Sequence, residues 1–163
     1  VNMLGALNFK PDDPSAYGEV GVVYYKARNY EGSILPLKCA VRGCTALESC
    51  TVRNSGLECS EEMAADPSLP ITGLPLTNTT AIYYYIYGSV LAGMNTPATN
   101  YCAEAYRVFN EISAGFAGDD TIMAIVKEGQ AICDNARFGA TQTVVALTPV
   151  SGITPTPTIT PSP

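Results

Sequence analysis

The chain has 163 residues, of which 47% are hydrophobic, so it is long enough to bury a core and is not expected to be disordered. Fifteen acidic residues against nine basic ones give a net charge of −6. This charge argues against nucleic acid or an anionic membrane surface as a partner, because both attract basic patches, and no apolar run in the sequence predicts a membrane-spanning helix.

Residues 1–13 begin with a short apolar stretch that ends at Phe9. The segment from Pro11 to Pro14 closes this stretch and opens the next helix. Asp13 is a candidate N-cap, and Pro14 stands at the first helical position, where a missing N–H is harmless.

Residues 14–45 predict a two-helix hairpin. Four residues at i, i+3, i+4 and i+7 share one helical face, and the glycine among them would let a second helix approach closely. Arg28 and Asn29 form the expected turn, after which a second apolar stripe has helical spacing. The first face consists of Tyr17, Val20, Gly21 and Tyr24, and the second stripe of Tyr30, Ile34, Leu37, Ala40 and Val41.

Residues 46–78 lose the helical period and are rich in Gly, Ser, Pro and Cys, which predicts a long loop with a short helix near residues 59–65. A second hairpin is expected over residues 79–115, capped by Thr79 or Thr80 and interrupted by a polar insertion at residues 94–100. A last helix is expected over residues 119–135, beginning at Asp119 or Asp120. Its apolar stripe consists of Ile122, Ile125, Val126, Gly129, Ile132 and Cys133.

The spacing of these residues resembles the tetratricopeptide repeat (TPR). In the first hairpin the matching residues are Tyr17, Val20, Gly21, Tyr24, Tyr30, Ser33, Leu37 and Ala40. In the second they are Tyr84, Tyr87, Gly88, Leu91, Ala105 and Phe109. The departures from the family pattern are Tyr17 for Trp, Ser33 for Ala, Leu37 for Phe and Thr45 for the closing Pro. Ala6 and Leu7 would belong to the second helix of an earlier, partial repeat, and Pro11 stands at the closing position of that repeat.

The resemblance implies an all-α fold, a short TPR-like solenoid over residues 1–138. It would comprise a partial repeat (1–13), a repeat (14–45), the Cys-rich loop (46–78), a second repeat (79–115) and a capping helix (119–135). The cap would cover the apolar face of the last repeat. An extended Thr/Pro-rich tail is expected over residues 139–163.

Six cysteines without any histidine or Cys-x-x-Cys pair favour disulfides over zinc or redox sites, and disulfides indicate an extracellular or cell-surface setting. Antiparallel helices around residues 116–118 would place Cys102 opposite Cys133. The other four cysteines allow three pairings. We prefer the pairing that joins Cys39 to Cys59 and Cys44 to Cys50.

The sequence predicts neither an enzyme nor a cofactor or metal site. Without histidine there is no Ser-His-Asp, Cys-His or His-metal site, and no glycine-rich phosphate loop is present. Three acidic pairs suit acid/base chemistry or calcium, but each opens a helix, where carboxylates favour the helix dipole, and capping is the preferred interpretation. They are Asp12-Asp13, Glu61-Glu62 and Asp119-Asp120.

In the TPR family a concave groove is lined by the residues that follow the signature positions. The resemblance assigns to this groove Gly18, Val22, Tyr25, Tyr85, Ser89 and Ala92. Because these residues are mostly apolar, we expect the groove to suit an apolar extended segment rather than an acidic peptide terminus. The alternative is burial of this face by the long loop.

The tail offers a docking segment and modification sites. Residues 141–147 are rich in β-branched residues and predict an extended segment that would dock on a neighbouring copy, in particular Thr143, Val144, Val145, Ala146 and Leu147. The apolar N-terminal stretch is the alternative docking segment. The following tract resembles an O-glycosylated stalk, with an unmodified spacer as the alternative. The glycosylation candidates are Thr154, Thr156, Thr158, Thr160 and Ser162 in that tract, together with the sequon at Asn78.

These features together predict a non-enzymatic extracellular structural protein that associates with itself head to tail into a filament. The partners would be other copies of the chain and covalent glycans. The alternatives are a monomeric, surface-tethered peptide-binding module and an accessory domain of a larger cell-envelope enzyme.

Overall fold

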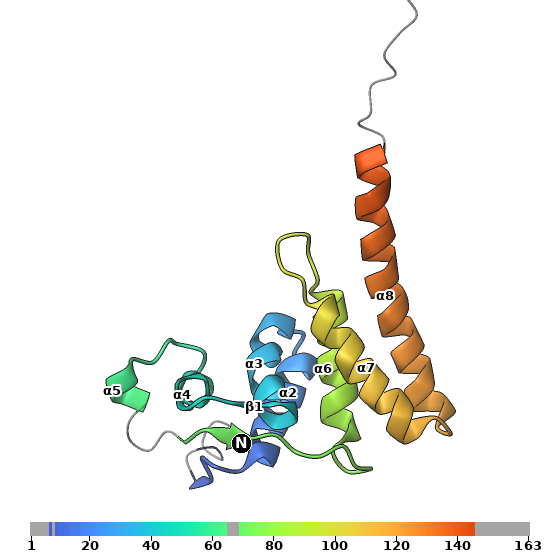
Figure 1. Cartoon of the computed structure of the whole chain (residues 1–163). Coiled ribbons are helices and arrows are strands. Elements are labelled where there is room, and N and C mark those ends of the chain that lie inside the picture. Colours follow the sequence, from blue (N-terminus) through green and yellow to red (C-terminus); the bar gives the residue numbers. More distant parts are fainter. Residues whose placement is uncertain (1–6, 8, 65–68, 146–163) are drawn as a thin grey trace, which may run out of the picture.

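The computed structural model describes residue 7, residues 9–64 and residues 69–145. These residues are mostly helical, as the sequence predicts, and the strands among them form a two-stranded sheet (Figure 1). The helices are α2 (Pro14–Lys26), α3 (Tyr30–Val41), α4 (Ala46–Arg53), α5 (Glu61–Ala64), α6 (Ala81–Gly93), α7 (Cys102–Phe116) and α8 (Asp120–Val145), and the strands are β1 (Gly43–Cys44) and β2 (Ile71–Thr72).

The first hairpin, α2 and α3, forms as its local sequence predicts. The Asp13 carboxylate accepts a hydrogen bond from the Ser15 N–H at 2.9 Å, and Pro14 occupies the first turn. Arg28 has a positive φ of 61° in the connecting turn, and the Asn29 side chain accepts a hydrogen bond from the Gly32 N–H at 3.0 Å. Both predicted features, the Asp13 cap and the turn at residues 28 and 29, are therefore confirmed.

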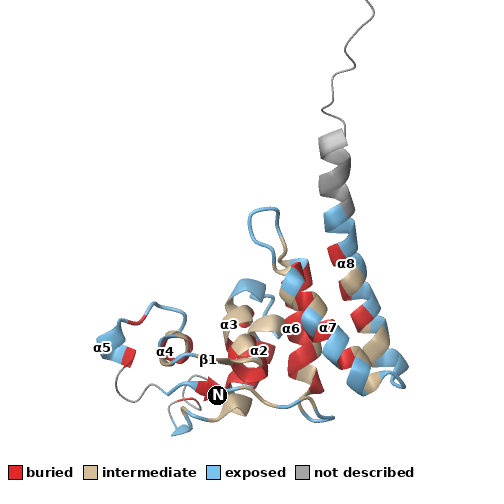
Figure 2. Ribbon diagram, viewed as in Figure 1, coloured by how far each residue is buried: buried red, intermediate tan, exposed pale blue. Residues whose placement is uncertain are grey.

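The helices pack in chain order. Helix α2 packs on α3, α3 on α6, α6 on α7, and α8 on both α6 and α7, while α2 also contacts α6 (Figure 1). Many of the buried residues lie on these helices (Figure 2). The largest fully buried side chains include those of Tyr17, Leu37, Leu91, Phe109 and Val126. One continuous core thus joins both hairpins and α8.

The two hairpins use the same packing device. A Cβ added to Gly21 on α2 would lie 2.5 Å from Cγ of Leu37 on α3. A Cβ added to Gly88 on α6 would lie 2.6 Å from Cε1 of Phe109 on α7. In each hairpin a glycine on the first helix makes room for a bulky side chain on the second, as the spacing predicts.

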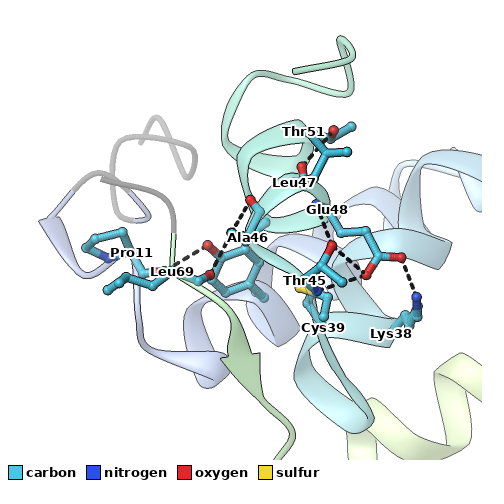
Figure 3. The surroundings of a disulfide bond; sticks show 12 residues. Pro11, Lys38, Cys39, Thr45, Ala46, Leu47, Glu48, Thr51 and Leu69 are labelled. Carbon is cyan, nitrogen blue, oxygen red and sulfur yellow. Dashed lines mark hydrogen bonds and ion pairs between the residues drawn. A yellow bond between two sulfur atoms is a disulfide. The ribbon is translucent and has the colours of Figure 1, made fainter. Parts of the chain in front are cut away.

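The segment between the hairpins is more ordered than expected. The short helix predicted near residue 60 is present as α5, but α4 was not predicted. Helix α4 begins with a capping box, in which the Glu48 N–H donates to Thr45 Oγ1 at 3.2 Å and the Thr45 N–H donates to Glu48 Oε2 at 3.0 Å (Figure 3). Glu48 also pairs with Lys38 of α3, and the buried Ser49 hydroxyl donates to the Leu69 carbonyl at 2.8 Å.

All six cysteines form disulfides. The predicted bond between Cys102 and Cys133 is confirmed, but the preferred pairing of the other four is wrong. The structure pairs Cys39 with Cys44 and Cys50 with Cys59. The chain reverses just after α3 at Gly43, whose φ of 82° returns Cys44 to Cys39, and this turn leaves the two cysteines of the α4 region to pair with each other.

Helix α8 is longer than predicted. Its start is confirmed, because the Asp119 carboxylate accepts a hydrogen bond from the Ile122 N–H at 3.0 Å. Its end lies at Val145 rather than near residue 135, so the extended conformation expected for Thr143, Val144 and Val145 is wrong. β-Branched residues disfavour a helix only slightly, and an established helix propagates through them. Ala146 and Leu147 lie outside the described residues.

Candidate binding groove

Three helices enclose a groove of about 390 Å³ on one side of the molecule. Helices α2, α6 and α8 each contribute side chains, most of which are aromatic or aliphatic. The lining residues are Tyr25, Lys26, Ile82, Tyr85, Ile86, Ser89, Ile125, Glu128, Gly129 and Ile132.

Helical periodicity explains why these residues meet. Helix α6 contributes Ile82, Tyr85, Ile86 and Ser89, which stand at i, i+3, i+4 and i+7 and so share one face. Helix α8 contributes positions 125, 128, 129 and 132 with the same spacing, and α2 contributes its last turn. Because α6 packs between α2 and α8, its face forms the middle of the groove.

A second hollow of about 220 Å³ continues the groove toward the start of α3. It shares Tyr25 and Ser89 with the first hollow and adds Tyr30, Val90, Gly93 and Met94. The rings of Tyr25 and Tyr30 lie with centroids 5.6 Å apart at 54°. Tyr25, Tyr30 and Tyr85 therefore give the combined surface an aromatic character.

The structure brings together three of the predicted groove residues. Tyr25, Tyr85 and Ser89 line the groove, but Val22 and Ala92 do not, because they are 4% and 1% exposed and belong to the core. The reason is the direct packing of α2 on α6, which closes the face on which Val22 lies. Gly18 is covered in the same way, since a Cβ there would lie 2.7 Å from the Tyr83 ring.

The prediction missed the isoleucines of the groove. Ile125 and Ile132 were recognised as part of the apolar stripe of α8, but that stripe has two roles. Val126 and Cys133 are buried in the core, whereas Ile125 and Ile132 remain partly exposed on the groove. The seven-residue separation of the two isoleucines is the signal that would have found them.

Charge is sparse along the groove. Lys26 and Glu128 are the two lining residues that are charged at neutral pH, and their charges are opposite. Between α6 and α2, the Tyr83 hydroxyl donates to Glu19 Oε1 at 2.7 Å, and burial together with this carboxylate raises the pKa of Tyr83 above its usual value. Apart from Lys26 and Glu128, which carry opposite charges, the groove presents mostly aromatic and aliphatic side chains.

The charged clusters elsewhere serve the fold. Nε of Arg42, just after α3, lies 2.6 Å from Glu104 Oε1, and its Nη1 lies 2.7 Å from Glu111 Oε1, so the arginine ties α3 to α7. Asp13 and Asp119 cap helices, in agreement with the interpretation of the acidic pairs. Among the described residues no cluster of His, Cys, Asp and Glu could hold a metal ion.

The predicted modification sites divide between described and undescribed residues. Asn78 is exposed in the turn before α6, a position that an oligosaccharide could reach. The candidates Thr154, Thr156, Thr158, Thr160 and Ser162 lie outside the described residues.

No family model, curated protein or solved structure matches this chain. Within the part of the chain that the structure describes, no helix is long and apolar enough to cross a membrane.

Proposed function

We propose that this chain is a non-enzymatic extracellular structural protein, built as a short TPR-like solenoid, whose copies associate head to tail into a filament. The order of helix packing and the paired glycine contacts of Gly21 and Gly88 support the repeat architecture. The engagement of every cysteine in a disulfide supports an oxidising, extracytoplasmic location.

The observation that carries self-association is the overhang of α8. Cys102 is the first residue of α7, and its disulfide to Cys133 marks the point where α8 passes the end of its neighbour. Helix α8 nevertheless continues to Val145, and its last turns stand clear of the other helices (Figure 1). At 1.5 Å per residue the overhang is about 18 Å long.

An overhang of this kind favours a partner. In proteins most helical stability comes from packing an apolar face rather than from helix propensity. The overhang contains Phe138, Val144 and Val145, and no charged residue follows Arg137 in the sequence. A neighbouring copy would pack on the end of α8, and a contact between different surfaces of two copies extends into a filament unless it closes into a ring.

The test is sedimentation velocity of the full-length protein over a wide concentration range. We expect oligomers whose size grows with concentration. Replacing Phe138 and Val144 together by lysine should weaken association at least about tenfold, because lysine would be desolvated in the contact. Ala131→Lys, at an exposed position earlier in α8, is the matched control and should leave association unchanged. A wild-type chain that stays monomeric throughout would refute the proposal.

The groove supports a second candidate function, a monomeric module that binds a foreign apolar peptide and is tethered to a cell envelope. Its aromatic lining and balanced charge suit an extended, uncharged segment. Glycosylation belongs to either candidate, and an intact mass equal to the sequence mass would exclude it at Asn78 and in the tail.

A further inference from the structure

We infer that the groove between α2, α6 and α8 binds the Thr/Pro-rich tract of a second copy, residues 154–163. This inference rests on the proposed self-association and names the segment and the surface that meet. It replaces residues 143–147 as the docking segment, because α8 holds positions 143–145 in a helix.

The chemistry of the two surfaces is complementary. Proline-rich segments in the polyproline II form bind grooves lined by aromatic side chains, because the segment has little conformational entropy to lose. The groove and its continuation contain Tyr25, Tyr30 and Tyr85. Residues 154–163 carry four prolines, and residues 138–163 contain no Asp, Glu, Lys or Arg, so docking would desolvate no charge on the tract.

The dimensions also agree. Adjacent packed helices lie about 8–10 Å apart, so the path from α2 across α6 to α8 is about 16–20 Å long. A polyproline II segment rises about 3.1 Å per residue, so about six residues cross this path. The tract between Thr154 and Pro163 is long enough, with residues left to reach the hollow beside Tyr30.

The course of α8 directs the start of the tail away from the chain's own groove. Ile132 is the last α8 residue that lines the groove, and the helix continues to Val145. At 1.5 Å per residue it carries the chain about 20 Å away from its own groove before the tail begins. The same distance brings the tail toward a neighbour that packs on the overhang.

The experiment compares full-length proteins by sedimentation velocity and adds a synthetic, unmodified peptide of residues 153–163 as competitor. One variant carries Tyr25→Ser and Tyr85→Ser. The matched control carries Tyr101→Ser, a change at a partly exposed tyrosine just before α7 that lies outside the groove. Circular dichroism establishes that each variant is folded.

We expect the groove variant to associate at least about tenfold more weakly than wild type, the control to associate normally, and excess peptide to dissociate wild-type oligomers. Oligomers that persist in the groove variant and in excess peptide would overturn this inference while leaving self-association intact. A wild-type chain that is monomeric, with peptide shifting the NMR signals of the groove residues, would overturn docking on a second copy together with the proposed function. Absence of any peptide effect on those signals would overturn the groove assignment itself.

Discussion

Replacing Gly88 by alanine tests the packing device that both hairpins share. The Phe109 ring fills the space between α6 and α8, because a Cβ at Gly88 would lie 2.6 Å from its Cε1 and one at Gly129 would lie 2.1 Å from its Cζ. Phe109 is fully buried, so its ring cannot swing into solvent. A methyl group at position 88 must therefore displace the ring or separate the helices.

The expected effect is the difference between two opposing contributions. Overpacking a core costs about 1–3 kcal/mol, and a clash with a ring held from both sides belongs at the upper end of that range. Alanine in place of glycine within a helix contributes about 1 kcal/mol of stability. We therefore expect Gly88→Ala to lower the free energy of unfolding by about 2 kcal/mol.

Urea denaturation under non-reducing conditions measures this effect. The matched control is Gly93→Ala on the same helix, where a Cβ would meet nothing within 4 Å and a slight gain of stability is expected. Phe109→Leu combined with Gly88→Ala should recover part of the loss, since the smaller side chain gives the new methyl group room. If Gly88→Ala were as stable as Gly93→Ala, the close approach of the helices at Phe109 would be wrong.

Three further predictions concern disulfides and titration. Replacing Cys102 and Cys133 by serine should lower the free energy of unfolding by about 3–4 kcal/mol, because the disulfide closes a loop of 31 residues and so reduces the entropy of the unfolded chain. An unchanged midpoint of thermal unfolding would contradict this prediction. Burial alone would raise the pKa of Glu48, but hydrogen bonds from Lys38 and Thr45 outweigh burial, so the pKa is lowered in the folded protein. The stability that ionised Glu48 contributes is therefore present above its pKa in the unfolded chain and is lost as the pH falls through its pKa in the folded protein. The difference in stability between wild type and Glu48→Gln should therefore shrink below about pH 4, and a constant difference would argue against the pairing. Burial, reinforced by the charge of Glu104, raises the pKa of Tyr87 in the folded protein. The stability that the neutral Tyr87 side chain contributes should therefore be lost as the pH rises above about 10, the pKa of tyrosine in an unfolded chain. Tyr87→Phe should unfold at higher pH than wild type in a circular dichroism titration, and an equal or lower midpoint would refute the assignment.

Local signals in the sequence were sufficient for most of the helices. The Asp13 cap and the apolar spacing on α2, α3 and α6 act within one or two turns, so they can be recognised without knowledge of the fold. Helix α4 had an equally local signal, the capping box of Thr45 and Glu48, which the surrounding Gly, Ser and Cys residues obscured.

Features that depend on how helices meet were harder to predict. The pairing of Cys39 with Cys44 depends on the turn at Gly43, and several pairings fit the same spacing. Val22 and Tyr25 both follow signature positions of α2, but Val22 is buried in the core whereas Tyr25 is partly exposed on the groove. Whether a helical residue faces a groove or a neighbour is decided by the crossing of two helices, which the sequence of either helix does not specify.

Electron microscopy of the purified full-length protein tests the central claim most directly. The protein, concentrated under oxidising conditions, should form filaments with one subunit per axial repeat or a simple multiple of it. Isolated particles of monomer size at every concentration would contradict the account.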